Sequence, residues 1–193
     1  MINLRPSTIV PFAAGIVMLC TAAATAQAVS YRLLATNKTS TMQKEMNEAA
    51  QAGYRFGGVM GGDTEFGGSE VLTIMVRMPE AAPTFDYRLL ATSKTSTMQR
   101  EMQEAGDAGF EYRGQTVFGS AFGGDEVVVI LERNRRAPTQ AYEYHLLATS
   151  KTSTMQKELQ QAGEGGFEFV GITVGRTSMG GKEVIVITRR VRR

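Results

Sequence analysis

The sequence is poor in the residues from which most catalytic and metal centres are built. Its 193 residues include one cysteine, one histidine and no tryptophan. Cys20 lies in an N-terminal segment that we expect to be removed, which would leave the mature chain without a disulfide or a thiolate nucleophile. His145 alone supplies neither a Cys–His pair nor a histidine-rich metal site. We therefore expect no cofactor, no metal and no enzyme activity, although a carboxylate-based hydrolase stays open.

An excess of charge of one sign is also missing. Lysine and arginine number 21 and aspartate and glutamate 19, which gives a formal net charge of +2. So small an excess predicts no nucleic-acid binding by the fold as a whole. Basic residues do gather at the C-terminus, and we interpret them as a solvated tail in preference to a polyanion-binding one. They are Arg189, Arg190, Arg192 and Arg193.

Long apolar runs are scarce, and the one near the N-terminus has the features of a secretory signal. Arg5 precedes an apolar stretch at 9–20, which is short for a membrane span. The Ala26-Gln27-Ala28 sequence after it is a small-x-small cleavage site. We expect residues 1–28 to be a signal peptide and the mature chain to be periplasmic or secreted, with no membrane span after cleavage.

The remaining chain is a threefold internal repeat. Tyr31, Tyr87 and Tyr144 open matching segments, with steps of 56 and 57 residues. We place the repeats at 29–78, 85–134 and 142–191, and call them repeats 1, 2 and 3. Both linkers between them contain Ala-Pro-Thr, as expected for short connectors.

Within each repeat the periodicity predicts strand, helix, strand, strand. An apolar-rich segment such as 31–36 is a strand candidate, and a helix follows it because Met42, Met46 and Ala49 recur at helical spacing. The same spacing explains the methionines as a helix core face and not as a soft metal site. Gly53, with its counterparts at 109 and 166, should end the helix in a positive-φ conformation. Glycine pairs at 67–68, 123–124 and 180–181 predict the turns between the last two strands.

The last strand of each repeat is apolar on both faces, as in 127–131 (VVVIL). A single helix covers only one face of a small sheet, so the other face must be buried elsewhere. We therefore predict an α+β fold of three tandem βαββ repeats, with sheets packed against each other and helices outside. A pseudo-threefold assembly is one such arrangement, and homo-oligomerisation is another way to bury the second face. A lone unit would be marginally stable.

The second half of repeat 3 reads GGFEFVGITV and, after the turn, GGKEVIVITRR. This part of each repeat resembles a bacterial family of small βαββ domains of unknown function. Members typically have a Gly-Trp-Glu-Leu-Val strand, and here Phe110 and Phe167 fill the tryptophan place, followed by Glu111 and Glu168. Tyr54 and Arg55 depart further from that pattern. The resemblance implies the fold and no activity.

The most strongly repeated stretch leads into the helix. Over 31–45, 87–101 and 144–158, 12 of 15 positions are identical, whereas 54–69 and 110–125 share 4 of 16. Part of this fits a capping box, in which Ser40, Ser96 or Ser153 pairs with the glutamine three residues later. That reading leaves the recurring lysine and threonines unexplained.

A helix N-terminus carrying a lysine and hydroxyls also suits an anion such as a carboxylate, phosphate or acidic sugar. A protein partner bound by three equivalent loops is a third reading. The sequence thus indicates an exported, non-enzymatic binding or assembly protein, and the ligand or partner stays open between an anion and a protein. The candidate ligand-binding residues are Lys38, Thr39, Ser40, Thr41, Lys94, Thr95, Ser96, Thr97, Lys151, Thr152, Ser153 and Thr154.

Overall fold

A computed structural model describes residues 28–64, 68–77, 84–119, 125–176 and 181–192. The predicted signal peptide and most of the predicted glycine turns lie outside these residues. Repeat 1 comprises β1 (Tyr31–Thr36), α1 (Thr39–Gln51), β2 (Tyr54–Thr64) and β3 (Gly68–Arg77). Repeat 2 comprises β4 (Phe85–Thr92), α2 (Thr95–Asp107), β5 (Glu111–Gly119) and β6 (Asp125–Asn134). Repeat 3 comprises β7 (Tyr142–Thr149), α3 (Thr152–Glu164), β8 (Glu168–Arg176) and β9 (Lys182–Val191).

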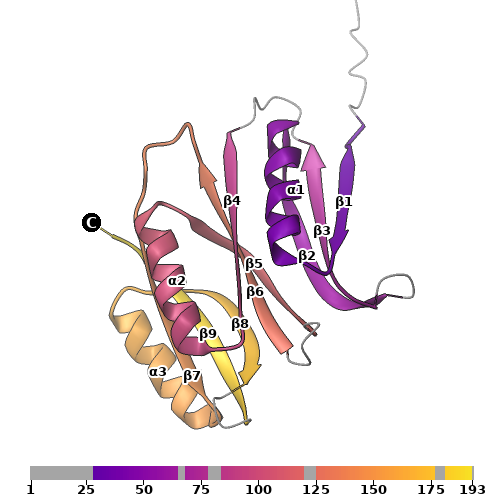
Figure 1. Cartoon of the computed structure of the whole chain (residues 1–193). Coiled ribbons are helices and arrows are strands. Elements are labelled where there is room, and N and C mark those ends of the chain that lie inside the picture. The colour runs from indigo at the N-terminus through magenta and orange to yellow at the C-terminus, as the bar shows by residue number, and fades with distance from the viewer. Residues whose placement is uncertain (1–27, 65–67, 78–83, 120–124, 177–180, 193) are drawn as a thin grey trace, which may run out of the picture.

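Each repeat folds as one antiparallel three-stranded sheet with its helix on one face, which confirms the predicted α+β fold of three βαββ units (Figure 1). The last strand is central, in the orders β1-β3-β2, β4-β6-β5 and β7-β9-β8. The first strand therefore lies at a sheet edge in every repeat. Gly53, Gly109 and Gly166 end the helices with φ values of 85°, 81° and 78°, as predicted from their spacing.

The repeats stack in chain order, each on the next. We call the sheet face that carries the repeat's own helix the helix side, and the opposite face the back. The core around α1 includes Tyr87, Leu89, Val128 and Ile130 from the back of the repeat 2 sheet. The core around α2 likewise includes Tyr144 and Ile187 from repeat 3. Each hydrophobic core in the first two repeats is thus completed by the following repeat.

This stacking buries the central strand of repeat 2 on both faces, as its composition predicted. All five residues from Val127 to Leu131 are buried. In repeat 1 the outcome differs, because Ile74 on the back of the sheet is 47% exposed. The array is therefore open at its ends, not closed around a pseudo-threefold axis. The helices also differ from the prediction in part, because α1 lies beside β4 and α2 beside β7, each between two repeats (Figure 1).

Three of the four C-terminal arginines are part of this packing, so their interpretation as a solvated tail was wrong, and Arg193 lies outside the described residues. Arg189 Nη1 lies 2.7 Å from Glu111 Oε1, and Arg190 Nη2 lies 2.8 Å from Glu143 Oε2. Arg192 pairs with Asp107 of α2 at 2.7 Å. These arginines are held because β9 and the residue after it pass acidic side chains of repeat 3 and of repeat 2. No helix among the described residues is long and apolar enough to cross a membrane.

Candidate functional site

The repeated Lys-Thr-Ser-Thr stretches form the three helix N-termini, which point toward the same end of the molecule (Figure 1). Each helix begins at the threonine, and the preceding lysine, Lys38, Lys94 or Lys151, is the cap residue in extended conformation. The turn before it is held by a threonine: the backbone N–H of Lys94 donates to Thr92 Oγ1 at 3.1 Å. Thr36 and Thr149 accept the same bond from Lys38 and Lys151. This explains the threonine two residues before the lysine, which precedes the candidate stretch, and not the two that flank the serine.

The predicted capping box is wrong. Among the described residues, no side chain hydrogen-bonds to the cap of any of the three helices. The serines are exposed. In repeats 1 and 2 the glutamine of the pattern points instead to the next repeat, because an edge strand there offers it unpaired backbone groups.

The amides of α2 bind the edge of β7 as a neighbouring strand would. Gln99 donates to the carbonyl of Tyr144 and accepts from the N–H of Leu146, both at 2.8 Å. One turn later, Gln103 accepts from the N–H of Tyr144 at 3.0 Å and donates to the carbonyl of Tyr142 at 3.2 Å. These two side chains therefore satisfy four backbone groups at a sheet edge.

The same arrangement joins α1 to β4. Gln43 accepts from the N–H of Leu89 at 2.8 Å. Asn47 accepts from the N–H of Tyr87 at 2.9 Å and donates to the carbonyl of Tyr87 at 3.0 Å. The glutamine in the first two copies of the repeated stretch is therefore at a docking position between repeats. The sequence signal was present, since this glutamine is identical in all three copies, but it was assigned to the cap.

The repeated tyrosine is the second docking residue that the sequence analysis missed. Tyr144 is 2% exposed, and its hydroxyl accepts from the N–H of Tyr112 at 2.6 Å and donates to the carbonyl of Phe110 at 3.0 Å. Tyr87 accepts from the N–H of Phe56 in the same way. The backbone N–H groups of Phe56 and Tyr112 lie at a β-bulge that recurs in β2 and β5. Burial raises the pKa of the Tyr144 hydroxyl far above its usual value, so it stays protonated and able to donate.

Each junction also contains an arginine–glutamate pair, with opposite polarity at the two junctions. Arg55 of β2 binds Glu132 of β6 through two nitrogens, with the shortest contact 2.7 Å. Glu111 of β5 binds Arg189 of β9 at 2.7 Å. Positions 55 and 111 are equivalent, so the charge is reversed from one junction to the next.

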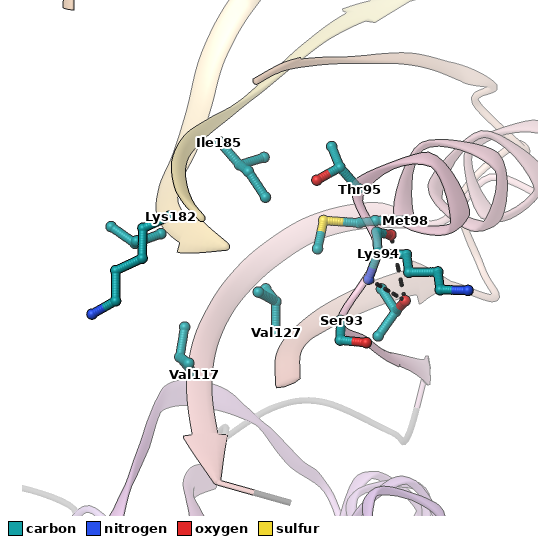
Figure 2. A pocket seen from close by; sticks show the side chains of 10 residues that line it. Ser93, Lys94, Thr95, Met98, Val117, Val127, Lys182 and Ile185 are labelled. Carbon is teal, nitrogen blue, oxygen red and sulfur yellow. Dashed lines mark hydrogen bonds between the residues drawn. The ribbon is translucent and has the colours of Figure 1, made fainter. Parts of the chain in front are cut away.

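A cavity of about 240 Å³ lies where the Lys94 stretch meets repeat 3 (Figure 2). Figure 2 shows Met98, Val127 and Ile185 facing its interior, whereas the ammonium groups of Lys94 and Lys182 point outward on opposite sides. Thr95 donates to the carboxylate of Glu183 from repeat 3 at 2.6 Å. The Glu183 carboxylate thus binds at the N-terminus of α2, where the anion hypothesis expected an external ligand.

The other candidate residues lie at the helix N-termini of their own repeats. All twelve are exposed or half-buried, and binding of an external anion to them stays a prediction. His145 is exposed at the edge of the Phe167 ring, consistent with a surface residue. No protein-family model, curated protein or solved structure matches this chain, and the resemblance to small βαββ domains also stays a prediction.

The docking role of the glutamine predicts that alanine substitutions at the equivalent positions 99 and 156 change the free energy of unfolding by different amounts. Gln99→Ala is expected to lower the free energy of unfolding by about 1–2 kcal/mol, because it leaves two half-buried backbone groups of β7 unpaired. Gln156→Ala is the matched control, since Gln156 is exposed on α3, and its change should stay within about 0.5 kcal/mol. Urea unfolding of dilute protein measures both. Equal losses would contradict the docking role and restore a common capping role.

Proposed function

We propose that this chain is an exported, non-enzymatic binding or assembly protein of the bacterial envelope, and that its end repeats dock onto further protein. The observation that carries the proposal is the location of the most repeated residues. The glutamine and the tyrosine of the stretch lie at repeat-to-repeat contacts wherever a following or preceding repeat exists. Such residues support recognition of a neighbouring protein surface.

The two ends of the array supply the surfaces for this role. On β8 of repeat 3, Phe169, Ile172 and Val174 are each more than half exposed. On repeat 1, Tyr31 and Leu33 of β1 are about two-thirds exposed. Clustered exposed aromatic and aliphatic side chains are typical of interaction sites. Export would place these surfaces in the periplasm or outside the cell.

Photo-crosslinking in cells tests the proposal. A chain carrying p-benzoylphenylalanine in place of Ile172 should yield a discrete adduct with protein, because that side chain points from the open end of repeat 3. The same group in place of Lys157 is the matched control, since its equivalents Lys44 and Arg100 stay exposed on α1 and α2 although those helices are docked on a following repeat. Adducts that are absent at both sites, or equally abundant and diffuse at both, would refute a specific docking surface.

An anion or small polar ligand at the helix N-termini is the second candidate. It is supported by the cavity beside Lys94 and by the carboxylate that Thr95 already binds. We rank it below docking because the interior of that cavity is lined by the apolar side chains of Met98, Val127 and Ile185, which offer an anion no hydrogen bond. An enzyme ranks last.

A further inference from the structure

We propose that copies of this chain associate head to tail, with the helix side of repeat 3 in one copy packed on the back of the repeat 1 sheet in the next. This inference rests on the function proposed above and names the partner as a second copy. The contact would repeat, between chains, the two junctions that already exist within the chain.

The back of repeat 1 has the composition of a surface that is buried in the other repeats. Tyr31 is 65% exposed, whereas its equivalents Tyr87 and Tyr144 are 3% and 2% exposed. Ile74 is 47% exposed, whereas Ile130 at the equivalent position is fully buried. The same residue types are thus retained at the same positions although, within the described chain, no repeat precedes them. A preceding repeat 3 from another copy would bury them as repeats 1 and 2 bury their successors.

On the backs of repeats 2 and 3, a glycine receives side chains of the preceding repeat. A Cβ added to Gly114 would lie 3.1 Å from Cζ of Phe56 and 3.6 Å from Cγ1 of Val59. Gly171 is approached in the same manner by Tyr112 and Gln115 of repeat 2. These glycines are needed because the incoming side chains sit directly on the backbone.

The corresponding positions at the two ends of the chain are complementary and unfilled. Gly58 is the equivalent glycine of repeat 1, and no described heavy atom outside its chain neighbours lies within 4 Å of the position of a Cβ there. Phe169 and Ile172 are the equivalents of Phe56 and Val59, and they are 60% and 58% exposed. Repeat 3 therefore exposes the two side chains that would pack on Gly58, and the space above Gly58 in repeat 1 is open.

The polar part of the junction is available as well. Gln156 and Gln160 are exposed on α3 at the positions from which Gln99 and Gln103 bind β7. β1 lies at the edge of its sheet and can offer backbone groups as β7 does. In the proposed contact the two α3 amides would bind the backbone of β1 around Tyr31.

The two faces differ, so the association is heterologous and adds one chain at a time, as a ring or a filament. One element of the internal junctions is missing from it. Glu168 is the equivalent of Glu111, but the place of Arg189 is taken by Val76 in repeat 1. The contact between chains therefore lacks the ion pair, which makes it weaker than the junctions within a chain and dependent on concentration.

Sedimentation velocity of the purified chain beginning at Val29, with full-length protein run alongside, tests the inference. Wild type should sediment faster as its concentration rises. Ile172→Asp places a charge on the apolar surface of repeat 3, and Leu33→Asp places one on the apolar surface of repeat 1. Burying either charge is unfavourable, so each variant alone should be monomeric. A mixture of the two should form a 1:1 complex and nothing larger, because one intact copy of each face remains. Circular dichroism checks that both variants fold.

A gain of affinity provides the converse test. Val76→Arg supplies a partner for Glu168 of the next copy and should tighten the association about tenfold. Wild type that stays monomeric throughout, variants that associate like wild type, or a mixture without a complex would each overturn the inference. If Ile172 crosslinks in cells to a different protein while the purified chain is monomeric, the docking function stands and self-association fails. If Ile172 forms no adduct in cells and the purified chain is monomeric, both the docking function and self-association are refuted.

Discussion

Replacing Glu132 with alanine is expected to lower the free energy of unfolding by about 3 kcal/mol. Glu132 is 3% exposed and accepts hydrogen bonds from Arg55 and from the hydroxyl of Tyr87, which donates at 2.8 Å. Removing the carboxylate leaves the guanidinium groups of Arg55 and Arg113, each about a third exposed, without their nearest counter-charge. The loss exceeds that of a surface ion pair because these two groups and the Tyr87 hydroxyl lose their common partner together.

Glu111→Ala provides the matched comparison at the second junction. Glu111 pairs with Arg189 at the same distance, 2.7 Å, and Arg189 is only 17% exposed, but Glu111 is itself 36% exposed, so water reaches the site and can replace part of the lost interaction. We expect a smaller loss, of about 1–2 kcal/mol. Urea unfolding at constant m-value measures both variants. A loss for Glu132→Ala no larger than that for Glu111→Ala would mean that the first junction is held by its apolar contacts, and not by the buried carboxylate.

The reversed polarity of these pairs has a consequence for folding. Three nearly identical stretches in one chain could dock in several orders. Stacking repeat 1 directly on repeat 3 would bring Arg55 to Arg189, and stacking repeat 2 on a second repeat 2 would bring Glu111 to Glu132. Either arrangement opposes like charges in a half-buried site. The pairs therefore favour the order 1-2-3 over these two exchanges.

The elements themselves could be predicted from the sequence because their signals are local. The spacing of Met42, Met46 and Ala49 identifies the helix, and the apolar run at 127–131 identifies a strand that must be buried on both faces. Gly53 and its counterparts mark the helix ends by their conformation. Three copies of each signal made these assignments stronger than one copy would have been.

The junctions could not be predicted because their partners lie far apart in the sequence. Ser-x-x-Gln is compatible with a capping box and with an exposed serine beside a docking glutamine, and only the position of β7 decides between them. The glutamine Gln99 meets Leu146 across 47 residues, and Arg55 meets Glu132 across 77. Equally, nothing local distinguishes a free arginine tail from one in which Arg189 pairs with Glu111 of another repeat.

Gly106→Ala is expected to destabilise the protein by about 3 kcal/mol, although alanine is the better helix former. Gly106 is buried in α2 against repeat 3. A Cβ there would overlap the backbone carbonyl oxygen of Tyr142 and lie 2.9 Å from the Tyr144 ring. The clash is with backbone and a fixed aromatic ring, so β7 would have to move away from α2. That movement would also stretch the hydrogen bonds made by Gln99 and Gln103.

Gly163→Ala is the internal control, because Gly163 occupies the equivalent position on α3. No described heavy atom, apart from its chain neighbours and the adjacent helix backbone, lies within 4 Å of the position that its Cβ would take. Alanine should therefore stabilise this helix by about 0.5 kcal/mol through its higher helix propensity. Thermal and urea unfolding of dilute protein measure the two variants against wild type. The signs must be opposite if repeat-to-repeat docking, and not the helix itself, requires Gly106. A stabilising Gly106→Ala would show that α2 and β7 are not in the close contact on which the docking description depends.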